Sequence, residues 1–175
     1  MSVRTFDGHS PKLEQGVYVD EQAMVAGRVE IGADSSIWPM SVVRGDVNFI
    51  RIGTRTNIQD GSVLHVTHDS DFAPGGQPLI IGDEVTVGHK VVLHACTVED
   101  RCLIGMGAVV LDGALIRTGA MVGAGALVTP DKDLEGGYLY VGSPARRQRE
   151  LTEKEKAFLG YSADHYVQLK NRWLE

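Results

Sequence analysis

The chain has 175 residues, a net charge of −6, 21 glycines, two cysteines and only 6% aromatic residues. This length fits one domain with a sizeable core, and the acidic balance argues against nucleic acid or an anionic membrane as a partner. With no hydrophobic leader, no apolar run of about eighteen residues and too few cysteines for a disulfide framework, we expect a cytoplasmic protein.

A six-residue repeat dominates the chain. Each unit begins with an aliphatic residue, a small or β-branched residue lies four positions later, and glycine often follows the aliphatic position. The aliphatic positions are Leu13, Val19, Val25, Ile31, Ile37, Val43, Ile52, Ile58, Leu64, Ile81, Val87, Leu93, Val98, Ile104, Val110, Ile116, Val122 and Val128. A period of six fits neither an amphipathic helix nor a hairpin ladder. It is typical of a parallel β-helix, in which each unit forms one short strand and one corner and the aliphatic side chains stack inward.

The eighteen units make six three-sided coils, and the regular spacing is interrupted three times. The interruptions lie between Val43 and Ile52, between Leu64 and Ile81, and between Leu93 and Val98. Each follows the third unit of a coil, so all three fall at the same corner of the prism. Because loops often carry function, we expect the functional site at this corner.

Three histidines lie next to these interruptions. His65 follows Leu64 and His94 follows Leu93. The stretch from Leu64 to Ile81 contains 11 residues more than the repeat requires. Subtracting them from the 29 residues that separate His65 and His94 leaves 18, which is one full coil. The two imidazoles should therefore stack on the same face, with backbones about 4.8 Å apart.

His89 belongs to the preceding unit of its coil, on another side of the prism. It can face the His65–His94 pair only if a neighbouring chain supplies it, as in a closed threefold oligomer. Three imidazoles with one open position are the pattern of catalytic zinc. His68, three residues after His65, is either a solvated loop residue or a proton relay, a role for which imidazole is suitable because it gains and loses a proton near physiological pH.

The repeat ends near Leu134, and Gly136 and Gly137 mark the exit. We therefore divide the chain into a β-helix over residues 1–136 and a C-terminal segment over residues 137–175. In this segment Thr152 and Glu155 form a capping box that opens a helix.

We expect Gly160 to end that helix and Ser162 to cap a second one. Tyr166, Leu169 and Trp173 fall on one face of the second helix, which we expect to pack along the prism.

The segments Arg44-Gly45-Asp46 and Asn57–Ser62, together with His65, His89 and His94, resemble the gamma-class carbonic anhydrase family from Val19 to about Arg146. The resemblance implies an all-β, left-handed parallel β-helix with C-terminal α-helices, assembled as a homotrimer with metal sites at subunit interfaces. It also implies that His65 and His94 bind the metal from one subunit and His89 from the next.

The same resemblance assigns roles to further residues. Gln59 would hydrogen-bond the metal-bound water, and Arg44, Asp46 and Asp60 would organise the site and the interface. For these charged residues, surface ion pairs between coils are the alternative. Tyr161 resembles the family's tyrosine near the metal, although simple packing explains it equally well. The sequence departs from the founding members at Val47, where they carry an acidic residue, and at His68, where they carry the proton-shuttle glutamate.

These features predict reversible hydration of carbon dioxide to bicarbonate by a metal-bound hydroxide. We expect the metal to be zinc, with iron and cobalt as alternatives because imidazole suits all three. Two other classes remain open. One is a hexapeptide-repeat acyltransferase or a metal-dependent thioesterase acting on acyl-CoA, and the other is a trimeric scaffold that binds metal without turnover.

Overall fold

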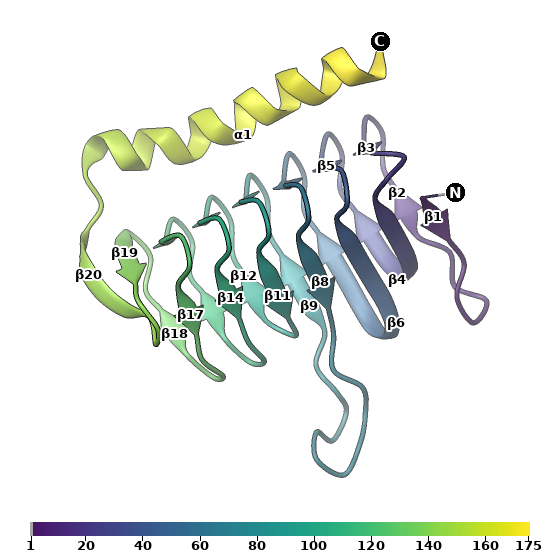
Figure 1. The fold of residues 1–175 in the computed structure, drawn as a ribbon, viewed down its shortest axis with the longest axis horizontal. Coiled ribbons are helices and arrows are strands. Elements are labelled where there is room, and N and C mark those ends of the chain that lie inside the picture. Colours follow the sequence, from purple (N-terminus) through teal and green to yellow (C-terminus); the bar gives the residue numbers. More distant parts are fainter. Residues whose placement is uncertain (1) are drawn as a thin grey trace.

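The computed structural model describes residues 2–175, which form a left-handed parallel β-helix with one α-helix along its side (Figure 1). The parallel strands stack into three faces, which we call A, B and C in the order in which the chain visits them. The fold class expected from the repeat is therefore confirmed.

Face A contains β1 (Val3–Arg4), the first halves of β4 (Met24–Ile31) and β6 (Val42–Ile52), β8 (Val63–His65), β11 (Val92–His94), β14 (Val109–Val110) and β17 (Leu127–Val128). Face B contains β2 (Lys12–Leu13), the second halves of β4 and β6, β9 (Leu79–Ile81), β12 (Thr97–Val98), β15 (Leu115–Ile116) and β18 (Asp133–Leu134). Face C contains β3 (Tyr18–Val19), β5 (Ser36–Ile37), β7 (Asn57–Ile58), β10 (Thr86–Val87), β13 (Leu103–Ile104), β16 (Met121–Val122) and β19 (Tyr138–Val141).

The core is the stack of aliphatic side chains that the repeat predicts. All eighteen positions lie in strands, and from Val25 to Val128 each of them is buried. Val19 is half-buried against the same core, but Leu13 is 40% exposed. The expectation that Leu13 is a core residue is therefore wrong. Its strand, β2, pairs only with β4, so no coil covers it from the other side.

Two substitutions at equivalent repeat positions should therefore differ in cost. Ile104 is fully buried in the middle of the stack, so Ile104→Ala is expected to lower the free energy of unfolding by about 2–5 kcal/mol. Leu13→Ala, at the open end, is expected to cost less than about 1 kcal/mol. Urea unfolding of both variants measures the difference. An equal loss of unfolding free energy in the two variants would contradict the idea that Leu13, at the open end of the β-helix, contributes less than Ile104.

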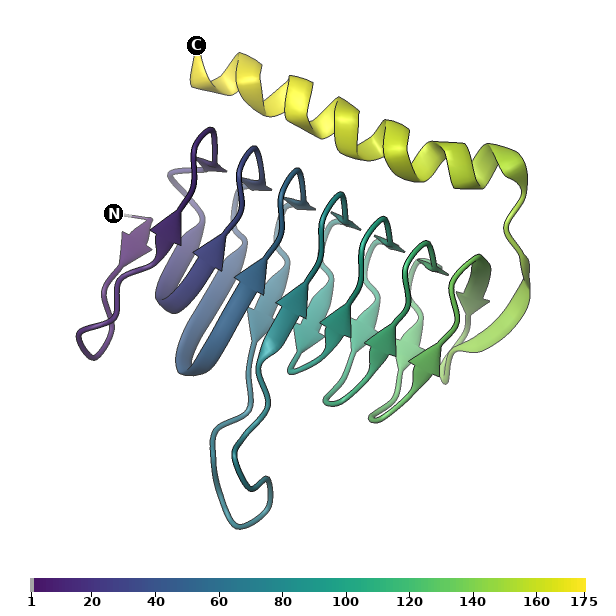
Figure 2. The same ribbon diagram turned by 180° about the vertical axis from the view of Figure 1, so that it is seen from behind.

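The three interruptions of the repeat all lie at the corner between faces A and B, as expected. There β6 runs on from face A to face B, β11 turns directly into β12, and the loop of residues 66–78 joins β8 to β9. In Figures 1 and 2 this loop projects from the prism.

The C-terminal region differs from expectation in the number of helices. Parallel stacking continues through β19, after which β20 (Arg146–Glu150) pairs antiparallel with it. A single helix, α1 (Glu153–Leu174), then runs back along face C (Figure 2). Its capping box at Thr152 and Glu155 is present as predicted.

The expected break at Gly160 does not occur. A glycine within a helix costs only about 1 kcal/mol, and burial of Leu159 and Ala163 beside it outweighs that cost. Ser162 is buried rather than capping a second helix, and its Oγ lies 2.8 Å from Thr86 Oγ1. Near the other end of α1, the buried Lys170 donates from Nζ to Asp34 Oδ1 at 2.7 Å. Nowhere in residues 2–175 does a helix have both the length and the apolar character needed to cross a membrane.

Candidate metal centre

His65 and His94 stack at the corner between faces A and B, as the spacing predicts. They end β8 and β11, which pair in parallel with His94 opposite His65. Their ring centroids are 5.2 Å apart, and His65 Nδ1 lies 3.2 Å from His94 Nε2. The inserted loop thus leaves the coil register intact and brings two imidazole nitrogens face to face.

The outward nitrogen of each ring is held by a carboxylate. His65 Nε2 lies 3.1 Å from Asp46 Oδ1, and His94 Nδ1 lies 2.6 Å from Asp112 Oδ1. Such carboxylate partners fix the tautomer and the orientation of metal-binding histidines. If each ring donates its N–H to its carboxylate, the two nitrogens that face one another both present lone pairs.

Two lone pairs at 3.2 Å repel unless a cation lies between them. Two nitrogens about 2.0–2.1 Å from one tetrahedral ion lie roughly 3.3 Å apart, so the observed separation suits a shared metal. A proton held between the rings is the other solution, but the pKa of His65 works against it. Burial lowers that pKa, and the charge of Arg44 lowers it further against the opposing effect of Asp46. The donor set therefore fits a metal.

Both carboxylates are themselves anchored. Arg44 forms an ion pair with Asp46, and the Thr67 hydroxyl donates to Asp112 Oδ2. Burial raises the pKa of each carboxyl group, but hydrogen bonds from Arg44 and His65 to Asp46, and from Thr67 and His94 to Asp112, bring both pKa values below their ordinary range. Both groups therefore remain acceptors at neutral pH.

His89 lies at the opposite edge of face A, at the corner with face C. It follows β10, its Nδ1 lies 2.9 Å from Asp60 Oδ2, and its side chain is 45% exposed. Four to five residues of strand span roughly 13–16 Å, so His89 lies across the width of face A from the His65–His94 pair. Within residues 2–175 no three His, Cys, Asp or Glu side chains are grouped so that they could hold a metal.

A cavity of about 280 Å³ lies beside His89, between face C and α1. Its polar members include Gln59, which is buried and donates from Nε2 to Asn57 Oδ1 at 3.0 Å. Apolar side chains form most of the remaining wall, namely Leu103, Ile104, Met106, Phe158 and Tyr166. The structure thus brings Gln59 next to His89 and away from His65 and His94.

Two predicted site residues lie apart from these groups. His68 is exposed at the base of the 66–78 loop and forms no hydrogen bond or ion pair with another described residue. Tyr161 is 62% exposed on the outer side of α1, where its ring stacks on His165 at 6.1 Å. The catalytic roles of His68 and Tyr161 stay predictions.

Sequence reasoning missed Asp112 and Tyr166. One coil after His94 falls on Leu111, because Leu93 pairs with Val110, and Asp112 is the next residue, so the coil arithmetic brings Asp112 to the same corner. Tyr166 lines the His89 cavity, and burial, followed by the charge of Asp60, raises its pKa. Its role depends on how α1 docks, for which the sequence carries no signal.

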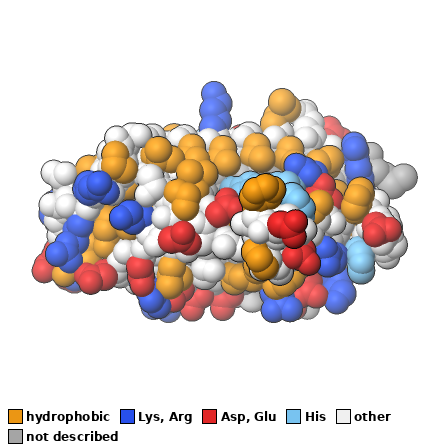
Figure 3. All heavy atoms as spheres, turned by 90° about the horizontal axis from the view of Figure 1, so that it is seen from below, with side chains coloured by type: hydrophobic (Ala, Val, Ile, Leu, Met, Phe, Trp, Pro, Cys, Tyr) orange, Lys and Arg blue, Asp and Glu red, His pale blue; other side chains and the backbone are white. Residues whose placement is uncertain are grey.

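The outer surface of face A is apolar between the two edges. Its outward residues are paired in register along the whole face, and each is half-exposed or exposed. They are Met24, Val42, Val63, Val92, Val109 and Leu127. Face B instead carries outward charges such as Lys12, Glu30 and Arg51, and α1 covers face C. Figure 3 shows a row of hydrophobic side chains beside the histidines.

Comparison with known proteins gives consistent matches. Residues 96–130 match the family described as the hexapeptide repeat of succinyl-transferase. The chain is 56% identical over 165 residues to protein YrdA of Escherichia coli, covering 94% of this chain and 90% of that protein. It is 46% identical over 157 residues to a probable carbonic anhydrase of Methanocaldococcus jannaschii, covering 90% and 94% of the two chains.

Two further matches have names that indicate different activities. The mitochondrial gamma carbonic anhydrase 1 of Arabidopsis thaliana is 47% identical over 160 residues, which cover 91% of this chain and 58% of that protein. Among solved structures, a putative acetyltransferase of Bacillus cereus superposes with a TM-score of 0.91 at 37% identity, covering 98% and 95% of the chains.

Proposed function

This chain belongs to the gamma-class carbonic anhydrase family, and from that premise we propose that it catalyses the reversible hydration of carbon dioxide at metal sites between the subunits of a homotrimer. The observation that carries the proposal is the pair of facing nitrogens of His65 and His94, each ring fixed by a carboxylate. His89 has the same kind of partner, Asp60, and its Nε2 has no hydrogen-bond partner among residues 2–175.

The apolar outer surface of face A supports the trimer. An exposed apolar face of this extent marks an interaction surface, and face A is flanked by His89 on one edge and the His65–His94 pair on the other. A threefold interface is heterologous, so it joins one edge of a chain to the other edge of its neighbour. That arrangement brings the partner subunit's His89 to the His65–His94 pair.

His65 and His94 of one chain and His89 of the next would hold the metal. Bound by three neutral imidazoles, a zinc ion would supply a Lewis acid that activates water at neutral pH for addition to the carbon of carbon dioxide. Iron and cobalt fit the same ligands.

The remaining residues of the site orient the three histidines and contribute to the adjacent cavity. Asp46, Asp60 and Asp112 hold one nitrogen of each histidine and so leave the other free to coordinate. Arg44 keeps Asp46 charged and in place. Gln59, fixed through Asn57, presents its amide to the cavity beside His89, where we assign it the role of hydrogen-bonding water or substrate.

Metal analysis and a stopped-flow hydration assay on the same purified sample test the proposal. We expect about one metal per chain and carbon dioxide hydration that is lost on chelation and restored by zinc, iron or cobalt. A fully metal-loaded trimer without hydration activity would sink the proposal.

Asp112 provides a test of how the histidine is positioned. Asp112→Asn keeps the size of the side chain but removes the charge that holds His94 Nδ1. We expect the metal affinity to fall about 10–100-fold while the fold is retained. Competition with a chelator measures the affinity, and Asp131→Asn, at an exposed corner, is the matched control. Unchanged affinity in Asp112→Asn would show that Asp112 does not support His94.

His68 is the proposed proton carrier, because each hydration releases a proton that must reach solvent. We expect His68→Ala to lower kcat and to leave kcat/KM nearly unchanged, with recovery by added imidazole, since a diffusible base replaces a missing relay. Kinetics in a poor buffer measure the effect. Equal kcat of mutant and parent there would contradict the role.

A second candidate function rests on the cavity beside His89. Its volume of about 280 Å³ and its apolar walls exceed what carbon dioxide needs and suit an acyl group. The likeness to the putative acetyltransferase points the same way. Hydrolysis or transfer of acyl-CoA by a sample that does not hydrate carbon dioxide would favour this alternative. Neither activity in a metal-bound trimer would favour a scaffold.

We further propose a cytoplasmic location. Cys96 and Cys102 are both free and buried in the core, where burial raises the pKa of each thiol to about 12. Such thiols act as core fillers and suit a reducing compartment.

A further inference from the structure

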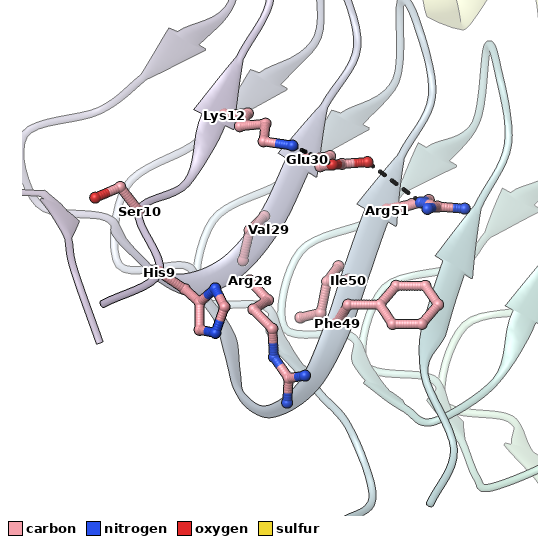
Figure 4. Close-up of a pocket in the computed structure, with 9 residues that line it drawn as sticks. All are labelled: His9, Ser10, Lys12, Arg28, Val29, Glu30, Phe49, Ile50 and Arg51. Carbon is pink, nitrogen blue, oxygen red and sulfur yellow. Dashed lines mark hydrogen bonds and ion pairs between the residues drawn. The ribbon is translucent and has the colours of Figure 1, made fainter. Parts of the chain in front are cut away.

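A second cavity lies near the N-terminal end of face B, and none of the residues to which a role is assigned above lines it. It has a volume of about 300 Å³ and lies between the segment of residues 9–12 and the strands β4 and β6 (Figure 4). Buried Val29 and Ile50 line it, together with the half-buried ring of Phe49. Val29 and Ile50 are buried in the core with almost no exposed surface, so the ring of Phe49 is the apolar surface that the cavity offers.

One rim of this cavity is a row of three charged side chains. Glu30 accepts from Lys12 Nζ at 2.9 Å and from Arg51 Nε at 3.2 Å, as the dashed lines in Figure 4 show. The hydrogen bond from Lys12 is the main reason why the pKa of Glu30 is lowered, so the carboxylate is charged at neutral pH. The Arg51 guanidinium also lies 5.0 Å from the centre of the Phe49 ring. The Glu30 carboxylate thus holds two cations, Lys12 and Arg51, at this rim.

The side chain of a third cation, Arg28, has no hydrogen bond or ion pair within residues 2–175. It follows Gly27, where the register between β4 and β6 shifts. Gly27 has a φ of +80°, and a Cβ there would lie 2.4 Å from Gly45 O, so only glycine fits this bend. Figure 4 shows the side chains of Arg28 and His9 side by side at the other end of the cavity. The bend therefore presents a guanidinium without a counter-charge.

The cavity carries three cations and one carboxylate on a chain whose net charge is −6. A local surplus of about two positive charges calls for a dianion, and the planar fork of arginine matches phosphate oxygens. The ring of Phe49 offers contact to an organic group. We propose that this cavity binds a small organic phosphate monoester, with the phosphate at Arg28 and His9 and the organic group against Phe49.

Phenyl phosphate, inorganic phosphate and benzoate are the probes, titrated calorimetrically into the intact protein. We expect phenyl phosphate to bind with a Kd below about 1 mM, and inorganic phosphate and benzoate to bind more weakly. Arg28→Gln should raise the Kd of phenyl phosphate about tenfold or more, because a charge-assisted hydrogen bond is lost. Arg172→Gln makes the same change at an exposed position of α1 and should leave the Kd unchanged.

Two further variants locate the bound molecule. His94→Ala should bind phenyl phosphate as the parent does, which separates this cavity from the metal centre. Phe49→Leu should reduce the preference for phenyl phosphate over inorganic phosphate. The proposal is overturned by absence of binding, by equal binding of benzoate, by an unchanged Kd in Arg28→Gln, or by loss of binding in His94→Ala.

Discussion

Mixing two inactive variants, His89→Ala and His94→Ala, is expected to restore carbon dioxide hydration. Each variant alone should lose tight metal binding and at least about 99% of its activity, because one of three ligands is missing. In a trimer reassembled from equal amounts of both chains, a site is complete when one chain supplies His65 and His94 and its neighbour supplies His89. Random assembly makes about a quarter of the sites complete in this heterologous arrangement.

The experiment measures activity and metal content after joint unfolding and refolding of the two variants. Each variant refolded alone is the first control, and His165→Ala, on the exposed side of α1, is the second. Circular dichroism should show an intact β-helix throughout, since the core is the aliphatic stack. Recovery to about a quarter supports sites shared between chains. No recovery from folded, mixed trimers would mean that each site forms within one chain.

Val63→Lys is expected to convert the trimer to monomers. Val63 is 40% exposed at the centre of the apolar surface of face A, between Val42 and Val92. The substitution therefore leaves the core of the single chain intact. Burying an unpaired ammonium group between subunits costs several kcal/mol of the free energy of assembly. This cost is larger than the favourable contribution that Val63 makes to the interface. The metal site should be lost with the trimer, because His89 no longer meets its partners.

Sedimentation equilibrium measures the result as a change from about 57 kDa, three times the chain mass of 18.9 kDa, to the chain mass itself. Ile80→Lys is the matched control, since Ile80 is a half-buried, outward-facing residue of the same type on face B. It should leave the mass unchanged. A trimer that survives Val63→Lys with full metal content would show that face A is not the interface.

The sequence alone was sufficient for the coil register and the histidine pair. In a β-helix each coil repeats the one before it, so the spacing of Leu64, Ile81 and Leu93 places His65 beside His94 whatever the intervening loop does. The same arithmetic places Leu111 one coil after His94, so it brings Asp112, the next residue, to the same corner. These features are local and periodic, which is why a single sequence determines them.

Features that depend on what covers a residue were decided only by the tertiary structure. Leu13 obeys the repeat yet is exposed, because its strand has a neighbour on one side only. Glycine is common at the ends of helices, but α1 continues through Gly160 because the helix packs on face C. That docking also leaves Tyr161 outside the His89 cavity and brings Tyr166 into it.

The apolar surface of face A depends on both the sequence and the tertiary structure. Its six outward residues can be read from the sequence as the positions just before every third repeat unit, from Met24 to Leu127. Equivalent positions on face C, such as Leu103 and Leu139, are apolar as well. Face C differs from face A in its polar residues at Ser36, Asn57 and Thr86, and the path of α1, which covers face C and leaves face A open, decides which face is exposed. The free energy of burying a helix against one face is a sum over contacts distant in sequence, and no periodic pattern encodes that sum.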